Sequence, residues 1–290
     1  MIRNILKMMK INHYIKNLVV FVPLIFSLNF ADLKLFLCTL LMSIAFCFIS
    51  SVVYIMNDLF DKEVDKNHPI KSKRPIASGC VSTNTAFFVL LLLFILSTTI
   101  SYFINLKCLI IVLAYLLLNL AYSLFLKRVV LIDAACIALG FILRIVAGCF
   151  AIKVLPSPLV ILMTFFVSQF FTFTKRKLEI SLLGDVSNTR ESIKELDIST
   201  ANQFILINAI LSISFYITYV LDAATIERAG TEYLYLTVMP FTLIIFRLYL
   251  LANSMKISDD PIIYLKKDKT IKYLFVLYLL VFFIAYLLLK

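Results

Sequence analysis

Long apolar runs, separated by short polar stretches, dominate the hydrophobic pattern of this 290-residue chain. A helix that crosses a bilayer needs about 20 consecutive, mostly apolar residues. We predict about nine spanning helices, at residues 17–33, 36–57, 84–104, 107–126, 130–152, 157–174, 201–221, 233–252 and 271–289. Pro23 lies inside the first run, so we expect that segment to be tilted or broken. The pattern predicts an all-α, polytopic membrane protein.

The composition supports this prediction, because 62% of the residues are hydrophobic and only 16% are charged. A soluble domain carries about 25% charged residues, and a soluble fold of this length could not bury so much apolar surface. The six cysteines form no CxxC pair, and most lie in apolar runs. We interpret them as small hydrophobic residues rather than as metal or redox sites.

The basic residues are distributed unevenly between the two ends of the predicted helices. With the N-terminus in the cytoplasm, the inner tail and loops hold 21 of the 28 Lys and Arg residues, and the outer side holds 5. Such a bias sets the orientation of membrane proteins. We predict a cytoplasmic-membrane protein with loops 58–83, 127–133 and 175–200 on the cytoplasmic side. The net charge of +11 then reflects topology and bound phosphates or head groups, and we expect no nucleic acid as a partner.

The most distinctive polar cluster is NDLFDKEVD at residues 57–65, where the second predicted helix ends. On a helix, Asp58, Asp61 and Asp65 are three and four positions apart and share one face. Three carboxylates at a membrane surface need a compensating cation. Oxygen ligands that do not enclose the ion suit Mg²⁺, which keeps water and accepts phosphate oxygens. We predict that these three aspartates bind Mg²⁺ with a diphosphate and act in catalysis, with Asn57 binding substrate beside them.

Basic residues follow directly, in the sequence KNHPIKSKRPIASG at residues 66–79. Lys71, Lys73 and Arg74 can neutralise a polyphosphate held by the metal, and we select Lys71 and Arg74 as substrate-binding residues. His68 has no partner at zinc-site spacing, so we interpret it as structural. The interleaved acids and bases predict a site for a phosphorylated substrate.

Residues 57–79 resemble the first aspartate-rich motif of the UbiA superfamily of intramembrane prenyltransferases, NDxxDxxxD followed by RPI or RPL. Members of that superfamily have nine helices around a central cavity open to lipid, with acidic cytoplasmic loops. The resemblance implies the same architecture here, as a single domain over residues 1–290 that contacts membrane lipids and uses Mg²⁺.

A second aspartate cluster, often DxxxD, is expected of quinone-type members of the superfamily. At the comparable place this chain has Asp133, with Lys127 and Arg128 beside it. Arg144 lies about three turns further into the predicted helix, and an arginine inside a span is either functional or paired within the bundle. We select Asp133 as a catalytic residue, and Tyr122, Lys127 and Arg144 as substrate-binding residues.

Further segments resemble one branch of the superfamily, the decaprenyl-phosphate phosphoribosyltransferase-like proteins. They are KINHYIKNLVVF at 10–21, KRKLE at 175–179, PFT at 240–242, RLY at 247–249 and DDP at 259–261. The first resembles the branch's RPxQWxKNLLVF and keeps Lys16, although Lys10 and Tyr14 replace its Arg and Trp. The second resembles KRxxE. We therefore add Lys16, Lys175 and Arg176 to the substrate-binding residues.

This branch resemblance implies transfer of a 5-phosphoribosyl group from phosphoribosyl diphosphate to a polyprenyl phosphate, with release of diphosphate. Mg²⁺ on the carboxylates would stabilise the leaving diphosphate, and the basic residues would bind two phosphorylated substrates. Two alternatives stay open: a prenyltransferase that acts on an aromatic quinone precursor, and a membrane transporter. The transporter is disfavoured because the charges gather at one membrane face. A homo-oligomer is compatible with the sequence.

Overall fold

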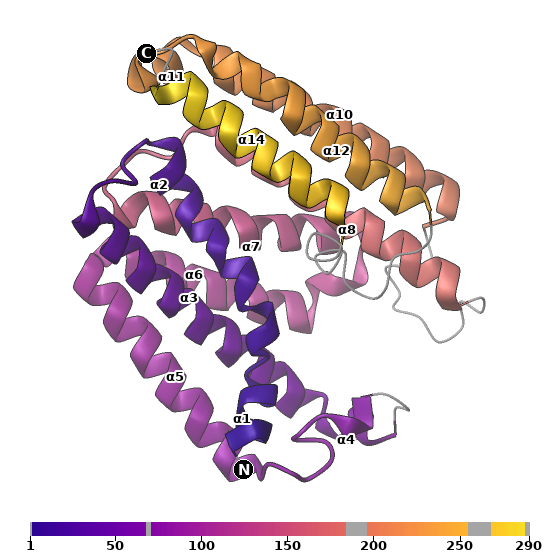
Figure 1. Cartoon of the computed structure of the whole chain (residues 1–290). Helices are drawn as coiled ribbons and strands as arrows, with labels where there is room; N and C mark the ends of the chain where they lie inside the picture. The colour runs from indigo at the N-terminus through magenta and orange to yellow at the C-terminus, as the bar shows by residue number, and fades with distance from the viewer. Residues whose placement is uncertain (1, 68–70, 184–195, 255–267, 288–290) are drawn as a thin grey trace. The chain divides into compact units, whose positions relative to one another are not determined.

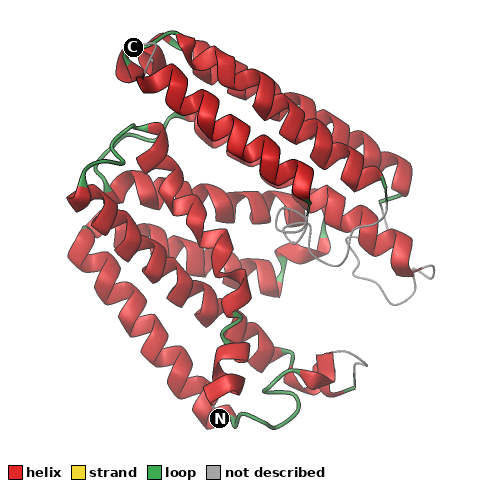
Figure 2. Cartoon of the chain, in the orientation of Figure 1, coloured by secondary structure: helices red, strands yellow, loops and turns green. Residues whose placement is uncertain are grey.

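A computed structural model describes residues 2–67, 71–183, 196–254 and 268–287. Within these residues every regular element is a helix and no strand forms (Figure 2). Eight helical segments are long and apolar enough to cross a membrane. They are α3 (Leu33–Phe60), α5 (Thr83–Ile104), α6 (Leu106–Leu124), α7 (Val130–Ala151), α8 (Pro158–Leu183), α10 (Ile198–Leu221), η5 with α12 (Tyr233–Asn253) and α14 (Lys269–Leu287). The predicted all-α membrane architecture is confirmed.

Side chains at the helix starts determine where several of these helices begin. Asp32 accepts hydrogen bonds of 2.8 and 3.1 Å from two backbone N–H groups in the first turn of α3. Ser82 and Asp197 accept one each, both at 3.1 Å, at the starts of α5 and α10. These caps satisfy N–H groups that a helix start leaves without a partner. The helix boundaries therefore follow the capping residues rather than the edges of the apolar runs.

The first predicted span differs from the structure. We predicted residues 17–33, whereas the chain forms a 3-10 helix, η1 (Ile11–Phe21), which continues into α2 (Val22–Phe26) at Pro23. A 3-10 helix rises about 2.0 Å per residue and an α-helix about 1.5 Å. Residues 11–26 therefore extend for about 30 Å, which is the thickness of the hydrocarbon core. Since this segment is short, a total of nine spans stays a prediction.

This N-terminal segment runs antiparallel to α3. The hydroxyl of Tyr14, near its start, lies 2.8 Å from that of Ser51 in the second half of α3. The ring of Phe21, at the end of η1, lies 5.8 Å from that of Phe36 in the first turn of α3. The segment therefore follows α3 from its C-terminal half to its start.

The chain divides into two compact units, each with its own apolar core. Unit 1 comprises Met1–Leu124 and Leu143–Pro156, and unit 2 comprises Phe125–Ile142 and Ser157–Lys290, so α7 contributes to both. In unit 1, α3 packs against α5 and α6, and in unit 2, α8 packs against α10 (Figure 1). A single domain over the whole chain stays a prediction.

The length of α3 explains how unit 1 carries a polar site. Its 28 residues correspond to about 42 Å at 1.5 Å per residue, which exceeds the hydrocarbon core by more than two turns. The polar residues Asn57 and Asp58 lie in its last turn. The end of α3 can therefore present them at the membrane surface while its apolar part spans the bilayer.

Candidate active site

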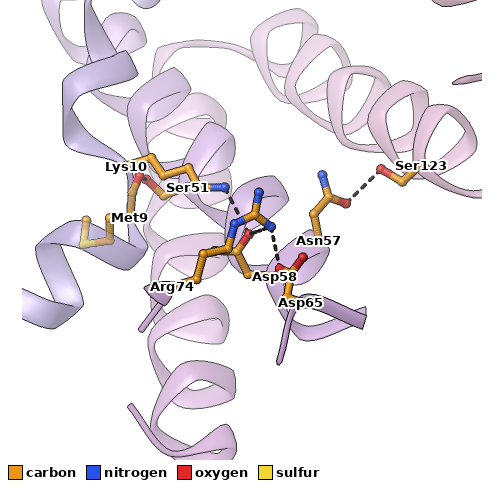
Figure 3. A network of polar contacts seen from close by, with 8 residues as sticks. All are labelled: Met9, Lys10, Ser51, Asn57, Asp58, Asp65, Arg74 and Ser123. Carbon is orange, nitrogen blue, oxygen red and sulfur yellow. Dashed lines mark hydrogen bonds and ion pairs between the residues drawn. The ribbon is translucent and has the colours of Figure 1, made fainter. Parts of the chain in front are cut away.

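The acidic motif brings two buried carboxylates together, Asp58 in the last turn of α3 and Asp65 just beyond it (Figure 3). The chain turns at Asp61 into α4 (Lys62–Lys66), which carries Asp65. The backbone N–H groups of Asp61 and Asp65 still donate to the carbonyls four residues earlier, at 2.9 and 2.8 Å. Helical spacing thus persists through the turn, as the motif predicted. Asp58 and Asp65 are only 2% and 1% exposed.

Two cations contact these carboxylates. Arg74 Nη1 lies 3.1 Å from Asp58 Oδ1 and 2.7 Å from Asp65 Oδ2, so one guanidinium bridges both acids. Lys10 Nζ lies 3.0 Å from the same Asp58 oxygen and 4.9 Å from the ring centroid of Tyr54. Lys10 was not selected from the sequence, because it lies 48 residues from Asp58. Both cationic side chains remain partly exposed, Arg74 at 29% and Lys10 at 24%.

The second oxygen of Asp58, Oδ2, is buried and accepts no hydrogen bond within the described part of the chain. A buried carboxylate oxygen without a donor is unfavourable, and a bound cation would remove that cost. Asp61, at the turn, is partly exposed. Proteins usually hold Mg²⁺ through one or two carboxylates together with water and substrate phosphates. The Asp58–Asp65 pair therefore fits Mg²⁺.

A complete protein cage for a metal is not formed by the described residues. Nowhere among them do three His, Cys, Asp or Glu side chains gather closely enough to hold an ion. Binding through Asp58, Asp61 and Asp65 together therefore stays a prediction. A metal at this site would need ligands from water or from the substrate.

The remaining predicted residues of unit 1 near this motif lie on four different elements. The Oγ of Ser123, on α6, donates to Asn57 Oδ1 at 2.8 Å and so ties α6 to the end of α3. Tyr122 precedes Ser123 and is partly buried. Lys71 begins η2 (Lys71–Lys73), and Lys16 lies on η1, each partly buried. Substrate contact by these residues stays a prediction.

Arg144, buried at 6% exposure on α7, is paired inside unit 1. Its Nε donates to Asn17 Oδ1 at 2.8 Å, and its Nη2 donates to the Tyr115 hydroxyl at 2.9 Å and to Ser50 Oγ at 3.3 Å. The guanidinium also lies 4.7 Å from the centroid of the Tyr115 ring. These bonds join η1, α3, α6 and α7. Of the two roles considered from the sequence, the geometry favours internal pairing.

In unit 2, the buried Arg176 joins two carboxylates. Its Nε and Nη2 lie 2.8 and 2.6 Å from Asp133 Oδ2, and its Nη1 lies 2.6 Å from Glu179 Oε2. Arg176 is 5% exposed, whereas Lys175 is exposed and lies 3.9 Å from Glu179 Oε1. We predicted a loop from residue 175, but α8 continues to Leu183. The KRKLE motif is therefore helical, which brings Arg176 and Glu179 to the same face.

Lys177, one residue further along α8, was missed by the sequence reasoning. It is buried, and its Nζ donates to the Ala252 carbonyl at 3.1 Å and to Asn253 Oδ1 at 2.9 Å, both at the end of α12 (Val238–Asn253). A lysine here satisfies one of the carbonyls that a helix end leaves without partners. Consecutive residues of an α-helix point about 100° apart. Helical periodicity alone could therefore have shown that Lys177 and Arg176 lie on different faces of α8.

Several predicted features lie outside the residues that the structure describes. Lys127 is partly buried in η3 (Leu126–Arg128), whereas the side chain of Arg128 lies outside the described residues. His68, residues 184–195 of the loop 175–200, and the DDP segment 259–261 also lie outside them.

Known proteins resemble this chain in sequence and in fold. The sequence profile of the UbiA prenyltransferase family matches residues 19–267. A decaprenyl-phosphate phosphoribosyltransferase of Mycolicibacterium smegmatis is 28% identical over 242 residues, covering 80% of this chain and 75% of the relative. An uncharacterised protein of Sinorhizobium fredii is 30% identical over 276 residues, covering 93% of this chain. The match covers 53% of that relative, so the chain spans about half of its length.

Among solved structures, a UbiA homologue of Archaeoglobus fulgidus bound to GPP and Mg²⁺ superposes with a TM-score of 0.72. The match covers 96% of this chain and 99% of that one, at 18% sequence identity. At this identity the likeness shows a shared fold.

Proposed function

Because the chain belongs to the UbiA prenyltransferase family, a family of integral membrane transferases, we propose that it transfers a 5-phosphoribosyl group from phosphoribosyl diphosphate to a polyprenyl phosphate. The observation that carries this proposal is the buried Asp58–Asp65 pair with two partly exposed cations. Such a site suits a diphosphate that arrives with a divalent metal. The relative named as a decaprenyl-phosphate phosphoribosyltransferase supports the choice of donor and acceptor.

The proposed reaction forms one C–O bond and breaks another. An oxygen of the lipid phosphate attacks C1 of the ribose, and the bond from C1 to the diphosphate oxygen breaks with its electron pair on the diphosphate. The products are a polyprenyl phosphate carrying phosphoribose and free diphosphate. No proton has to be removed, because the attacking phosphate is already an anion.

The protein's part in this reaction is to bind the leaving group and to neutralise its charge. Bound Mg²⁺ would supply electrostatic stabilisation of the diphosphate as it leaves. Asp58 and Asp65 would hold the metal, since the second oxygen of Asp58 has no donor among the described residues. Arg74 and Lys10 would donate to phosphate oxygens through charge-assisted hydrogen bonds. Preorganised charges of this kind usually contribute most to catalysis of phosphate departure.

The sequence resemblance also assigns catalysis to Asp133 and the binding of phosphorylated substrates to Lys175 and Arg176, all in unit 2. Arg176 holds Asp133 through two of its nitrogens, so the carboxylate is oriented and neutralised. The exposed Lys175 would contact a substrate phosphate. A neutral aromatic acceptor would need fewer cations than a ribose 5-phosphate and a lipid phosphate together. This balance favours phosphoribosyl transfer over aromatic prenylation. We propose that the protein acts in the cytoplasmic membrane, with these groups on the cytoplasmic side.

Transfer of radiolabel tests the proposal directly. Purified protein in lipid nanodiscs is incubated with Mg²⁺, a polyprenyl phosphate and phosphoribosyl diphosphate labelled in the ribose, and the organic extract is counted. We expect label in the lipid phase, and we expect Asp58→Asn to reduce it by about two orders of magnitude, the scale of one lost electrostatic contact.

Glu63→Gln is the matched control for Asp58→Asn. Glu63 lies on α4 beside the site, but its side chain is 75% exposed and accepts hydrogen bonds of 2.8 Å from Lys66. That hydrogen bond lowers the pKa of Glu63, so the pair neutralises itself. The control should keep near wild-type activity. If the protein prenylates 4-hydroxybenzoate and leaves phosphoribosyl diphosphate unused with polyprenyl phosphates of several lengths, the proposed donor is wrong.

A further inference from the structure

The carboxylates proposed to hold the metal are the ones that Arg74 and Lys10 contact. Asp58 Oδ1 accepts from both cations, at 3.1 and 3.0 Å, and Asp65 Oδ2 accepts from Arg74 at 2.7 Å. Figure 3 shows both cationic side chains converging on Asp58. A divalent ion bound to these carboxylates would lie within a few ångströms of two positive charges and would be repelled. The ion pairs and a metal therefore compete for the same carboxylates.

The backbone at Lys10 is held in an unusual conformation that aims its side chain at Asp58. Lys10 has φ 53° and ψ 48°, in the left-handed region that residues with a Cβ rarely adopt. Two hydrogen bonds stabilise this backbone turn. Ser51 Oγ donates to the Met9 carbonyl at 2.9 Å, and the Lys10 N–H donates to the Lys7 carbonyl at 3.2 Å. Strain of this kind persists only where surrounding contacts over-determine it.

The two cations differ from Arg176 in how firmly they are held. Arg176 is 5% exposed and joins Asp133 to Glu179. Arg74 and Lys10 are 29% and 24% exposed, and the ammonium of Lys10 ends a flexible chain. Because both are partly exposed, neither cation becomes a buried, unpaired charge when it changes partners. A diphosphate offers them several strong acceptor oxygens nearby.

We propose, on the basis of the function proposed above for this site, that Lys10 and Arg74 are exchangeable counter-ions of Asp58 and Asp65. Each pairs with the carboxylates before the substrate binds and moves onto the diphosphate when it arrives. The metal then binds to the two carboxylates that the cations have left. Metal and diphosphate therefore bind with strong positive coupling, and the metal alone binds weakly.

Equilibrium binding measures this coupling without turnover. Mn²⁺ replaces Mg²⁺ as the probe, and ³²P-pyrophosphate represents the leaving group. Protein-bound Mn²⁺ and bound label are measured on the full chain in nanodiscs, at buffered free Mn²⁺. For the wild type we expect pyrophosphate to tighten Mn²⁺ binding at least about tenfold, within the usual range of coupling between two sites.

Two variants remove the competing charges. Lys10→Gly removes the ammonium and suits the left-handed backbone, and Arg74→Gln removes the bridging guanidinium. We expect each variant to bind Mn²⁺ alone about tenfold more tightly than the wild type and to show less coupling to pyrophosphate. Lys66→Met is the control, because it removes one charge from α4 that pairs with the exposed Glu63. The control should leave the coupling unchanged.

The outcomes separate this exchange from the proposed function. If the wild type binds Mn²⁺ equally well with and without pyrophosphate, or if both variants bind Mn²⁺ alone no more tightly, the exchange is refuted while diphosphate binding stands. If the folded wild type binds neither probe and Asp58→Asn keeps full transfer activity, the proposed function of this site fails, and the exchange fails with it.

Discussion

At the residue scale, the motif identified the acids of the site but could not identify their partners. Asp58, Asp65 and Arg74 were all selected from one short stretch, and Arg74 does contact both acids. Lys10 and Ser123 were missed, because they reach the motif from 48 and 66 residues away in the sequence. Side-chain pairing across such distances depends on how helices pack, and a single sequence carries no signal for it. The hint available at Lys10 was its position in the segment KINHYIKNLVVF, where it takes the place of the Arg in the branch motif.

Arg144 gives a prediction at the same scale. Its guanidinium donates from Nε and Nη2 to acceptors on different helices and stacks near Tyr115. Lysine offers a single nitrogen and cannot reproduce this geometry. We expect Arg144→Lys to lower the free energy of unfolding by about 2–3 kcal/mol, the scale of lost hydrogen bonds to a buried charge. Thermal unfolding in detergent measures this change.

Arg247 offers the matched control for Arg144. It forms an ion pair with Asp268, with Nη2 and Oδ2 2.8 Å apart, and its side chain is 34% exposed. Arg247→Lys should therefore cost less than about 1 kcal/mol. Should Arg144→Lys prove as stable as the wild type while losing transfer activity, Arg144 would be a substrate-binding residue and its internal pairing would be secondary.

At the element scale, the apolar runs located the long helices, but not the form of the N-terminal segment. The runs follow from the need to cover a bilayer with side chains, so eight long segments could be predicted. Their ends moved by a few residues because caps such as Ser82 lie outside the runs. The 3-10 form of η1 has no comparable signal. The predicted span began at residue 17, although η1 begins at Ile11, and the buried Asn17 bonds to Arg144.

The contact of this segment with α7 predicts the direction in which a glycine substitution changes stability. A Cβ on Gly148 would overlap the carbonyl oxygen of Val20 and would lie 3.1 Å from Pro23 Cγ. In a helix without such a neighbour, Gly→Ala stabilises by about 1 kcal/mol. Overpacking against a backbone atom instead costs about 1–3 kcal/mol. We therefore expect Gly148→Ala to unfold at a lower temperature than the wild type. A higher unfolding temperature would show that η1 does not pack closely on α7.

At the scale of the whole molecule, the charge bias predicts which loops face the cytoplasm. The contacts of unit 1 show which end of α3 lies beside each end of the N-terminal segment. Lys10 contacts Asp58 at the far end of α3, and Phe21 contacts Phe36 at its start. The Nζ of Lys7, on α1 (Ile2–Met8), also lies 3.5 Å from the carbonyl of Lys73. The N-terminus and the loop 58–83 should therefore lie on one membrane face, provided that residues 11–26 cross the bilayer.

Cysteine labelling decides both points. Cys80 is exposed in this loop, and it can be kept as a reference after the other five cysteines are replaced. Arg3→Cys reports the N-terminal face, and Glu227→Cys on α11 (Ala223–Ala229) reports the opposite face, since five spans separate it from Cys80: α5, α6, α7, α8 and α10. In intact cells an impermeant maleimide should modify Glu227→Cys alone, because the positive-inside bias places the other two in the cytoplasm.

Modification of Arg3→Cys but not Cys80 would show that residues 11–26 do not cross, leaving eight spans. Modification of Cys80 would reverse the orientation and place the Asp58 site on the outer face.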